Sequence, residues 1–292
     1  MDDGGVVLES KFVSGLHVET VYAEDRKLAS DFCNTYELNG FAETPAALRD
    51  TSDIIYIKTA IGKRYEFICD ALRNGKHVIA SYPFAEESQT QAALYALARE
   101  NNVLITPDIP LAYMRAFQQL IWHMSGGLIG DIISVECSAF YEDDRLYALA
   151  LPLFVFSKLL GTDPVEASYY GADDAENGIV YDRLSVQYGN SFTSAVVGTS
   201  KWISNRMSVV GTKGRIDIPE DWRLMGYFKA DIDGEAHTKR YSFNIDGNGM
   251  RYLLQETLIT IRDGILDSVR FTPDEAAWVA KLLDGIRAPG RS

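Results

Sequence analysis

The sequence predicts an α/β protein in which an incomplete Rossmann-like parallel sheet is followed by an α+β domain with a large, mostly antiparallel sheet. Short apolar runs alternate with helical segments over residues 17–120, the order typical of a parallel sheet with crossover helices. Beyond residue 130, strand-like runs separated by Gly, Asn and Asp follow one another. We therefore expect two domains, 1–120 and 121–292, with C-terminal helices that can pack back on the first.

The elements of the first domain follow from its periodicity. A β-rich run at 17–23 precedes a helical segment in which Leu28, Phe32 and Tyr36 recur every four residues. Thr44 and Pro45 mark a further helix start, Gly75 a helix end, and Ser88 an N-cap. Three apolar strands and the two helices between them are expected at 53–59, 63–76, 77–81, 87–102 and 103–108.

The N-terminal stretch GVVLESKFVSG, residues 5–15, is either a helix or a strand that forms a hairpin with 17–23, and we favour the helix. A strand, glycine-rich turn and helix that bind a dinucleotide fill about 30 residues. Only 16 residues precede His17, and Gly4-Gly5 is their sole glycine pair. Because the first strand of a doubly wound sheet is central, we expect its loss to be repaired by direct pairing of its neighbours or by a partner's strand.

The second domain reads as one sheet with flanking helices. Segment 146–160 is apolar all round, which is typical of a buried helix, and Thr272-Pro273 begins the last helix after another at 249–265. Seven strand-like segments are expected at 131–142, 165–172, 179–189, 192–203, 206–218, 224–232 and 236–245.

Composition excludes several classes of function. The net charge of −13 argues against a nucleic-acid partner, which needs clustered Lys and Arg. The longest apolar run, 146–156, is too short to span a bilayer, and the acidic N-terminus is unlike a signal peptide, so we expect a cytoplasmic protein. The three cysteines are far apart and the four histidines are scattered, so neither a disulfide framework nor a metal site is expected.

Four stretches, in this order along the chain, resemble the glucose–fructose oxidoreductase/inositol dehydrogenase family, Gfo/Idh/MocA. They are residues 53–85, GGLIGDIISVECSAF, VVGTKGRIDIPEDW and GNGMRYLLQE, the last two resembling its dihydrodiol-dehydrogenase-like branch. The resemblance implies a Rossmann domain and a second-domain sheet that forms a homodimer. It also implies hydride transfer between NAD(P) and a sugar or related alcohol.

The residues that the resemblance implies for catalysis are replaced. Ser81 and Tyr82 stand where the family has the Glu and Lys of a Glu-Lys-Pro turn. Tyr147 and Phe154 stand where it has an Asp and a His, on a helix without a titratable side chain from 148 to 157 apart from Ser157. Tyr82 is either a substitute acid or, as we favour, an aromatic that packs against the protein or stacks on a ligand.

The remaining candidates concern a cofactor. Glu24, at the end of the 17–23 run, stands near the position of an acidic ribose ligand, although an acidic helix start explains it better. Thr59, Arg64 and Asp108 follow strands, where α/β sheets bind ligands, and Tyr82 lies in such a loop. With the glycine-rich turn absent, we expect no cofactor.

These observations favour a non-catalytic family member over an enzyme. Such a protein would form a homodimer through its second-domain sheet, its cleft would be vestigial or would bind a ligand or partner without turnover, and it could regulate or scaffold an active family relative. The alternative is an NAD(P)-dependent oxidoreductase with a rebuilt site, using Tyr82 as acid with Asp108 or Asp144 in support. A cofactor-free lyase or hydrolase is a weaker third possibility, since no Ser-His-Asp or metal constellation is present.

Overall fold

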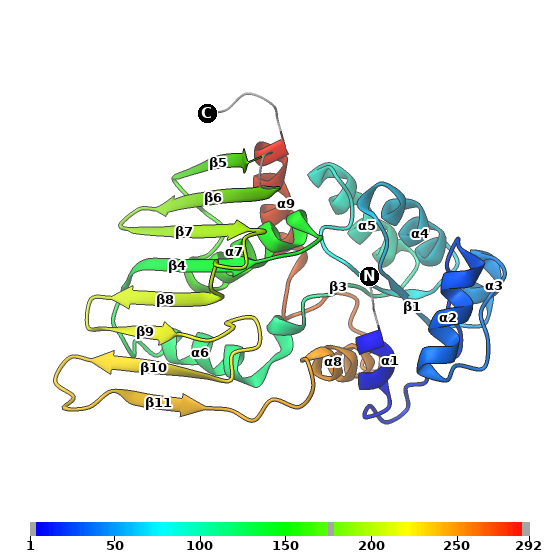
Figure 1. Cartoon of the computed structure of the whole chain (residues 1–292), viewed down its shortest axis with the longest axis horizontal. Coiled ribbons are helices and arrows are strands. Elements are labelled where there is room, and N and C mark those ends of the chain that lie inside the picture. Colours follow the sequence, from blue (N-terminus) through cyan, green and yellow to red (C-terminus); the bar gives the residue numbers. More distant parts are fainter. Residues whose placement is uncertain (1–3, 175–177, 288–292) are drawn as a thin grey trace. The chain divides into compact units, whose positions relative to one another are not determined.

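The protein is described by a computed structural model covering residues 4–174 and 178–287 (Figure 1). The chain divides into two compact units. The first comprises the residues up to 113 together with 246–273, and the second comprises 114–245 together with the residues from 274 onward. The predicted fold class is confirmed, because one unit holds a small parallel sheet and the other a large, mostly antiparallel one.

The parallel sheet of the first unit has the order β1-β2-β3, with strands Ile54–Ile57, His77–Ala80 and Ile105–Pro107. Helices α4 (Ile61–Arg73) and α5 (Ser88–Glu100) make the crossovers between them. A 3-10 turn, η1 (Pro110–Tyr113), follows β3. The strands are short and nearly all apolar, as expected for strands covered on both faces.

The segment 17–23 was expected to be a strand, and this prediction is wrong. Its only ladder contact is an isolated parallel bridge between Val21 and Phe41, supported by the Ala42 amide donating to the Val21 carbonyl at 2.8 Å. It does not pair with β1, which is an edge strand of the sheet among the described residues. A β-rich composition favours a strand but does not form one without a partner strand in register. The expected repair of the sheet by direct pairing therefore does not occur.

The helices near the N-terminus largely match the sequence. Residues Gly4–Ser10 form α1, which confirms the helix over the hairpin. Helix α2 (Arg26–Tyr36) is capped by Asp25, and α3 (Pro45–Asp50) by Thr44, whose hydroxyl accepts from the Ala47 amide at 3.1 Å. Ser88 is the first residue of α5 and not its N-cap, because Glu87 holds the extended cap position and makes no side-chain cap bond.

Helix α8 (Met250–Arg262) packs with α1 over the parallel sheet. A cluster of buried apolar residues joins them: Val13, Ile79, Met250, Leu253 and Leu254. At its border Arg251 binds Glu9 at 2.6 Å, and both side chains are largely buried. Gly247 has a positive φ of 65°, and a Cβ there would meet the Glu9 carboxylate at 2.1 Å. This glycine therefore gives the carboxylate its place.

The sheet of the second unit has eight strands in the order β11-β10-β9-β8-β4-β7-β6-β5 (Figure 1). All neighbours are antiparallel except β4 and β7. The predicted strand 206–218 is a hairpin of two strands. In chain order, strands β4 to β11 are Ile132–Phe140, Glu166–Asp174, Ile179–Tyr188, Ser191–Gly198, Arg206–Gly211, Gly214–Ile218, Tyr227–Ile232 and Lys239–Ser242.

Helices cover one face of this sheet. Helix α7 (Arg145–Leu160) packs on β4, β6 and β7, and α9 (Pro273–Arg287) joins it through the Lys158–Glu275 ion pair at 2.6 Å. Helix α6 (Arg115–Ser125) brings His123 against Phe228 and Tyr241 of the β10–β11 end. Along β4 the residues that face the helices are buried, whereas Glu136 on the other face is exposed.

Protonation of His77, at the start of β2, is expected to weaken the first unit. Its Nδ1 accepts from the Leu104 amide at 3.0 Å, and desolvation by burial lowers its pKa from 6.5. A lowered folded-state pKa stabilises the fold above pH 6.5, and this contribution is lost as the pH falls through the folded-state pKa. Through this group the unfolding free energy should fall by at most about 1.4 kcal/mol per pH unit, and by less because the imidazole is only half-buried.

Urea unfolding of the wild type and His77→Gln at several pH values between 5 and 7.5 measures this effect. The variant should have a smaller pH slope than the wild type below pH 6.5. Equal slopes would contradict the assignment.

Candidate functional site

The carboxyl edge of the parallel sheet brings together polar residues from all three strands. Lys58, Ser81 and Asp108 each follow directly on paired positions of β1, β2 and β3. The Asp108 carboxylate accepts a hydrogen bond of 2.6 Å from the hydroxyl of Tyr56, within β1. The Ser81 hydroxyl is buried and has no hydrogen-bond partner among the described residues. This edge is therefore the candidate ligand site of the first unit.

Tyr56 is a residue that the sequence analysis did not single out. It lies within the apolar run DIIYIKT, where an aromatic ring reads as core. The sequence feature that could have pointed to Tyr56 is its spacing from Lys58. Residues two apart on a strand share a face, so Tyr56 lies on the same face as Lys58 at the strand end. The partner carboxylate is 52 residues away in the chain, so no local pattern could pair them.

Arg64 is buried and acts within the chain. From the first turn of α4 its Nε and Nη2 donate to the Thr59 carbonyl at 3.2 and 2.7 Å, and Nη1 donates to the Pro83 carbonyl. The guanidinium thus ties the loop after β1 to the loop after β2. Thr59 contributes its carbonyl oxygen to this tie, and its own hydroxyl lies near the Ala60 carbonyl.

Tyr82 is fully buried in an aromatic cluster. Its ring meets Phe84 edge-on at 5.5 Å and Phe271, two residues before α9, at 5.2 Å. The peptide bond to Pro83 is cis. Edge-to-face contacts of this kind are typical of packing aromatics.

Glu24 is engaged by its own chain as well. Both of its carboxylate oxygens accept from Lys63 Nζ at 2.6 Å, while the neighbouring Asp25 caps α2. The ion pair is exposed and raises the pKa of Lys63.

The glycine pair at α1 does not fit a dinucleotide pyrophosphate. A Cβ on Gly4 would meet the ring of Tyr36 at 1.8 Å, and one on Gly5 would lie 2.7 Å from the Asn248 amide nitrogen. The space that glycine gives up in a phosphate-binding turn is here filled by the chain's own side chains. Helix α1 has seven residues, which is short for a helix that binds an anion at its N-terminus. Gly4 and Gly5 therefore leave no room for a pyrophosphate at this point of the chain.

Helix α7 places Tyr147 and Phe154 in different surroundings. Phe154 is fully buried, with its ring 5.5 Å from that of Phe117, whereas Tyr147 is half-buried in the first turn. Every residue from Ala148 to Ser157 is buried. Asp144 is the N-cap, accepting from the Tyr147 amide at 2.9 Å, and Asp143 is exposed.

A buried carboxylate stands beside the start of α7. Asp182, on β6, has a fully buried side chain that binds Arg145 through Nε and Nη2 and accepts from the Tyr169 hydroxyl. Burial and this hydrogen bond raise the pKa of Tyr169 to about 12. A Cβ on Gly171 would lie 2.3 Å from the Tyr169 oxygen, so the glycine lets that side chain cross to Asp182. The members of this cluster lie on three elements that are far apart in the sequence, so no local sequence pattern predicts it.

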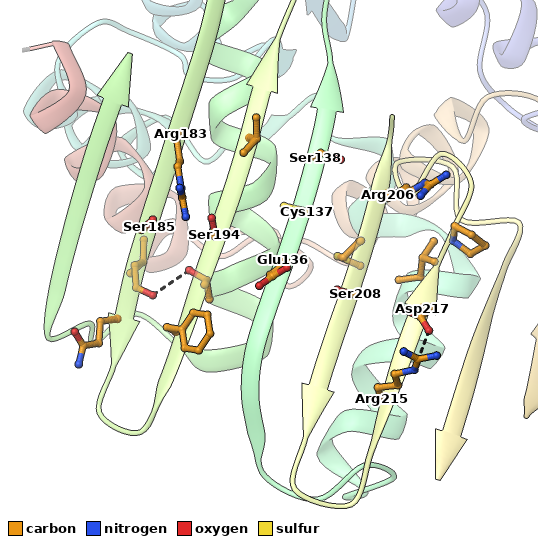
Figure 2. A pocket seen from close by; sticks show the side chains of 18 of the residues that line it. Glu136, Cys137, Ser138, Arg183, Ser185, Ser194, Arg206, Ser208, Arg215 and Asp217 are labelled. Carbon is orange, nitrogen blue, oxygen red and sulfur yellow. Dashed lines mark hydrogen bonds and ion pairs between the residues drawn. The ribbon is translucent and has the colours of Figure 1, made fainter. Parts of the chain in front are cut away.

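The uncovered face of the eight-stranded sheet is hollowed over a volume of about 1110 Å³ (Figure 2). Most of the side chains that line it are polar or charged. Figure 2 shows Ser185, Ser194 and Ser208 around Glu136, with Arg183 nearby. Sites for small molecules are usually concave and mostly apolar. This open hollow differs from such a site in its largely polar lining.

Two further kinds of site are absent from the described part of the chain. Between residues 4 and 287, with 175–177 left aside, no group of three His, Cys, Asp or Glu side chains could hold a metal ion. No helix within those same residues is long and apolar enough to cross a membrane.

Comparison with known proteins places the chain. The profile of GFO_IDH_MocA, described as an oxidoreductase family with an NAD-binding Rossmann fold, matches residues 8–109. Over this stretch of the first unit the chain is similar to the family. A trans-1,2-dihydrobenzene-1,2-diol dehydrogenase of Xenopus tropicalis is 21% identical over 297 residues, which cover 91% of this chain and 88% of that relative.

Two further similarities extend the comparison. A dTDP-3,4-didehydro-2,6-dideoxy-alpha-D-glucose 3-reductase of Actinomadura kijaniata is 33% identical over 95 residues, 32% of this chain and 29% of that relative. A 3-ketoreductase from Actinomadura kijaniata, solved with TDP-benzene and NADP, has a TM-score of 0.85 at 18% identity, covering 99% of this chain and 95% of that chain. This last likeness shows that the fold is shared.

Removal of the Arg145 side chain should destabilise the protein. Arg145→Met leaves the Asp182 carboxylate buried without its cation, which we expect to cost about 2–3 kcal/mol, at the low end for a broken buried pair because the guanidinium side chain is 42% exposed. The double variant Arg145→Met/Asp182→Asn should lose less, since no charge stays buried.

Urea unfolding measures these losses. Arg215→Met, which breaks the exposed pair with Asp231, is the matched control and should change stability little. A loss from Arg145→Met no larger than that of the control would refute the role given to the pair.

Proposed function

We propose that this chain is a non-catalytic member of the Gfo/Idh/MocA oxidoreductase family, which acts by binding and not by turnover. One observation carries the proposal. The ten residues 148–157 of α7, which include the position of the family's His, are all buried and present no acid or base. General acid–base catalysis needs a titratable group within hydrogen-bond reach of the substrate.

The first unit supports the same conclusion. At the position of the family's Lys, Tyr82 is enclosed by Phe84 and Phe271. Arg64 spends its donors on the chain's own carbonyl groups, and Glu24 is held by Lys63. Groups that would meet a cofactor or substrate thus have structural partners.

The alternative is an NAD(P)-dependent oxidoreductase that acts on a sugar or related alcohol with a rebuilt site. Similarity to the family favours it, as does the bond between Tyr56 and Asp108 at the edge of the parallel sheet. A tyrosine hydroxyl that donates to a carboxylate can accept a proton from a substrate as it passes its own proton to the carboxylate, and it can return the proton by the reverse path. In this alternative Tyr56 takes the role that the sequence suggested for Tyr82.

Nucleotide binding distinguishes the two functions. The melting temperature of the full chain is measured with NAD, NADH, NADP or NADPH at millimolar concentration. The proposal expects no change in that temperature. A nucleotide present at 100 times its dissociation constant would add about 2.7 kcal/mol and raise the melting temperature by several degrees. The Actinomadura 3-ketoreductase, solved with NADP, is the positive control.

A rise of several degrees with any nucleotide would overturn the non-catalytic proposal if turnover of an alcohol or ketone accompanied it. The kcat values of Tyr56→Phe and Tyr82→Phe would then be compared. The alternative expects Tyr56→Phe to lose kcat and Tyr82→Phe to keep it.

We further propose that the chain forms a homodimer through the uncovered face of the eight-stranded sheet. The face spans seven inter-strand gaps of about 4.8 Å and strands about 20 Å long, or about 700 Å². A standard interface buries about 800 Å² per partner. An active family relative with the same face is the other candidate partner.

Light scattering on the purified chain tests this assembly. We expect a mass twice that of the 32.5 kDa chain, falling toward one chain at low concentration. Ser194→Arg places a long cation among the small side chains at the centre of the hollow and should shift the equilibrium toward monomer. A wild type that stays monomeric at high micromolar concentration would contradict the homodimer.

A further inference from the structure

The uncovered sheet face carries charges of both signs that have no partner in the chain. Arg183, Arg206, Glu136 and Glu166 are exposed and line the hollow. Within residues 4–174 and 178–287 none of the four side chains makes an ion pair or a hydrogen bond. Elsewhere on the same sheet the opposite charges are paired, as in Arg215 with Asp217 and Asp231. The four charges are therefore available to an occupant of the face.

The register of the strands sorts these charges into rows. Arg183 on β6, Val196 on β7, Ser138 on β4 and Arg206 on β8 stand side by side. The next row on the same face holds Ser185, Ser194, Glu136 and Ser208 on the same strands. Figure 2 shows the two arginines toward one end of the hollow and Glu136 below them. A cationic row thus lies about 7 Å from a row whose only charge on these four strands is anionic.

The cationic row and the anionic row of one copy are complementary in charge to the same two rows of a second copy. When two copies pack face to face, their two-fold axis lies in the plane between the sheets. An axis that runs between the two rows places the cationic row of each copy over the Glu136 row of the other. The serines that flank Glu136 are small enough to admit a long side chain from the opposite copy. A ligand or partner of a single charge sign would leave half of the charges unmatched.

We propose that Glu136 of each copy pairs with Arg206 of the second copy across this two-fold axis, and that these two symmetric pairs fix how the sheets meet. Arg183 and Glu166 lie farther from β4 and complete the rim. This inference rests on the homodimer proposed above, and it names the contacts that specify it. Complementary charges steer association and exclude other alignments, since facing like charges oppose docking.

A charge-reversal cycle tests the pairing. The dissociation constant of the dimer is measured by analytical ultracentrifugation for the wild type, Glu136→Arg, Arg206→Glu and the double reversal. Each single reversal should raise the dissociation constant at least about tenfold, because it sets like charges face to face. The double reversal should recover most of the loss. Glu100→Arg, at the exposed end of α5, makes the same change in net charge away from the face and should have no effect.

The outcomes separate the pairing from the dimer itself. A dimeric wild type with recovery in the double reversal supports the pairing. A dimeric wild type in which the reversals behave like Glu100→Arg overturns the pairing and leaves the homodimer standing. A monomeric wild type overturns both. The melting temperatures of the four proteins, taken at a concentration where each is monomeric, should agree within about one degree, since the two charges do not pair within a chain.

Discussion

The burial of helix α7 against the eight-stranded sheet is the interaction on which most of the second unit depends. Ten consecutive residues of the helix are buried, most of them Leu, Phe, Val or Ala. Each large apolar side chain taken from water contributes about 1.5–3 kcal/mol. A stretch of helix that is buried all round has no face left for polar groups, so the same burial that holds the unit together leaves no acid or base side chain at positions 148–157.

The covered face of the sheet determines what the other face can do. Because α6, α7 and α9 lie on one side, the alternation of each strand sends its remaining side chains to the open side. That side carries serines and charged residues in register, and most of the residues that line its hollow are polar or charged. The architecture thus uses one face for the hydrophobic core and leaves open the other, which is the face that we propose for assembly.

In the first unit three charged residues hold loops and helices together. Arg64 joins two loops, Glu24 joins α4 to the chain before α2, and Glu9 joins α1 to α8. Arg64 and Glu9 are buried, and charged groups removed from water need such partners. The hydrogen bond between Tyr56 and Asp108 differs from these contacts in its place, because it lies where an α/β sheet binds its ligands.

The sequence by itself determined which segments are helices and strands in most of the chain, and the buried character of α7. These properties are local, because periodicity and residue type are read within a short window. Prediction from the sequence failed at 17–23, where a β-rich run makes only an isolated bridge, and at Ser88, one residue from the cap. Only the tertiary structure decided that Tyr56 meets Asp108, that Asp182 is buried under Arg145, and that two rows of charge share one face. Those relations depend on register and on contacts between residues far apart in the chain, which no local pattern encodes.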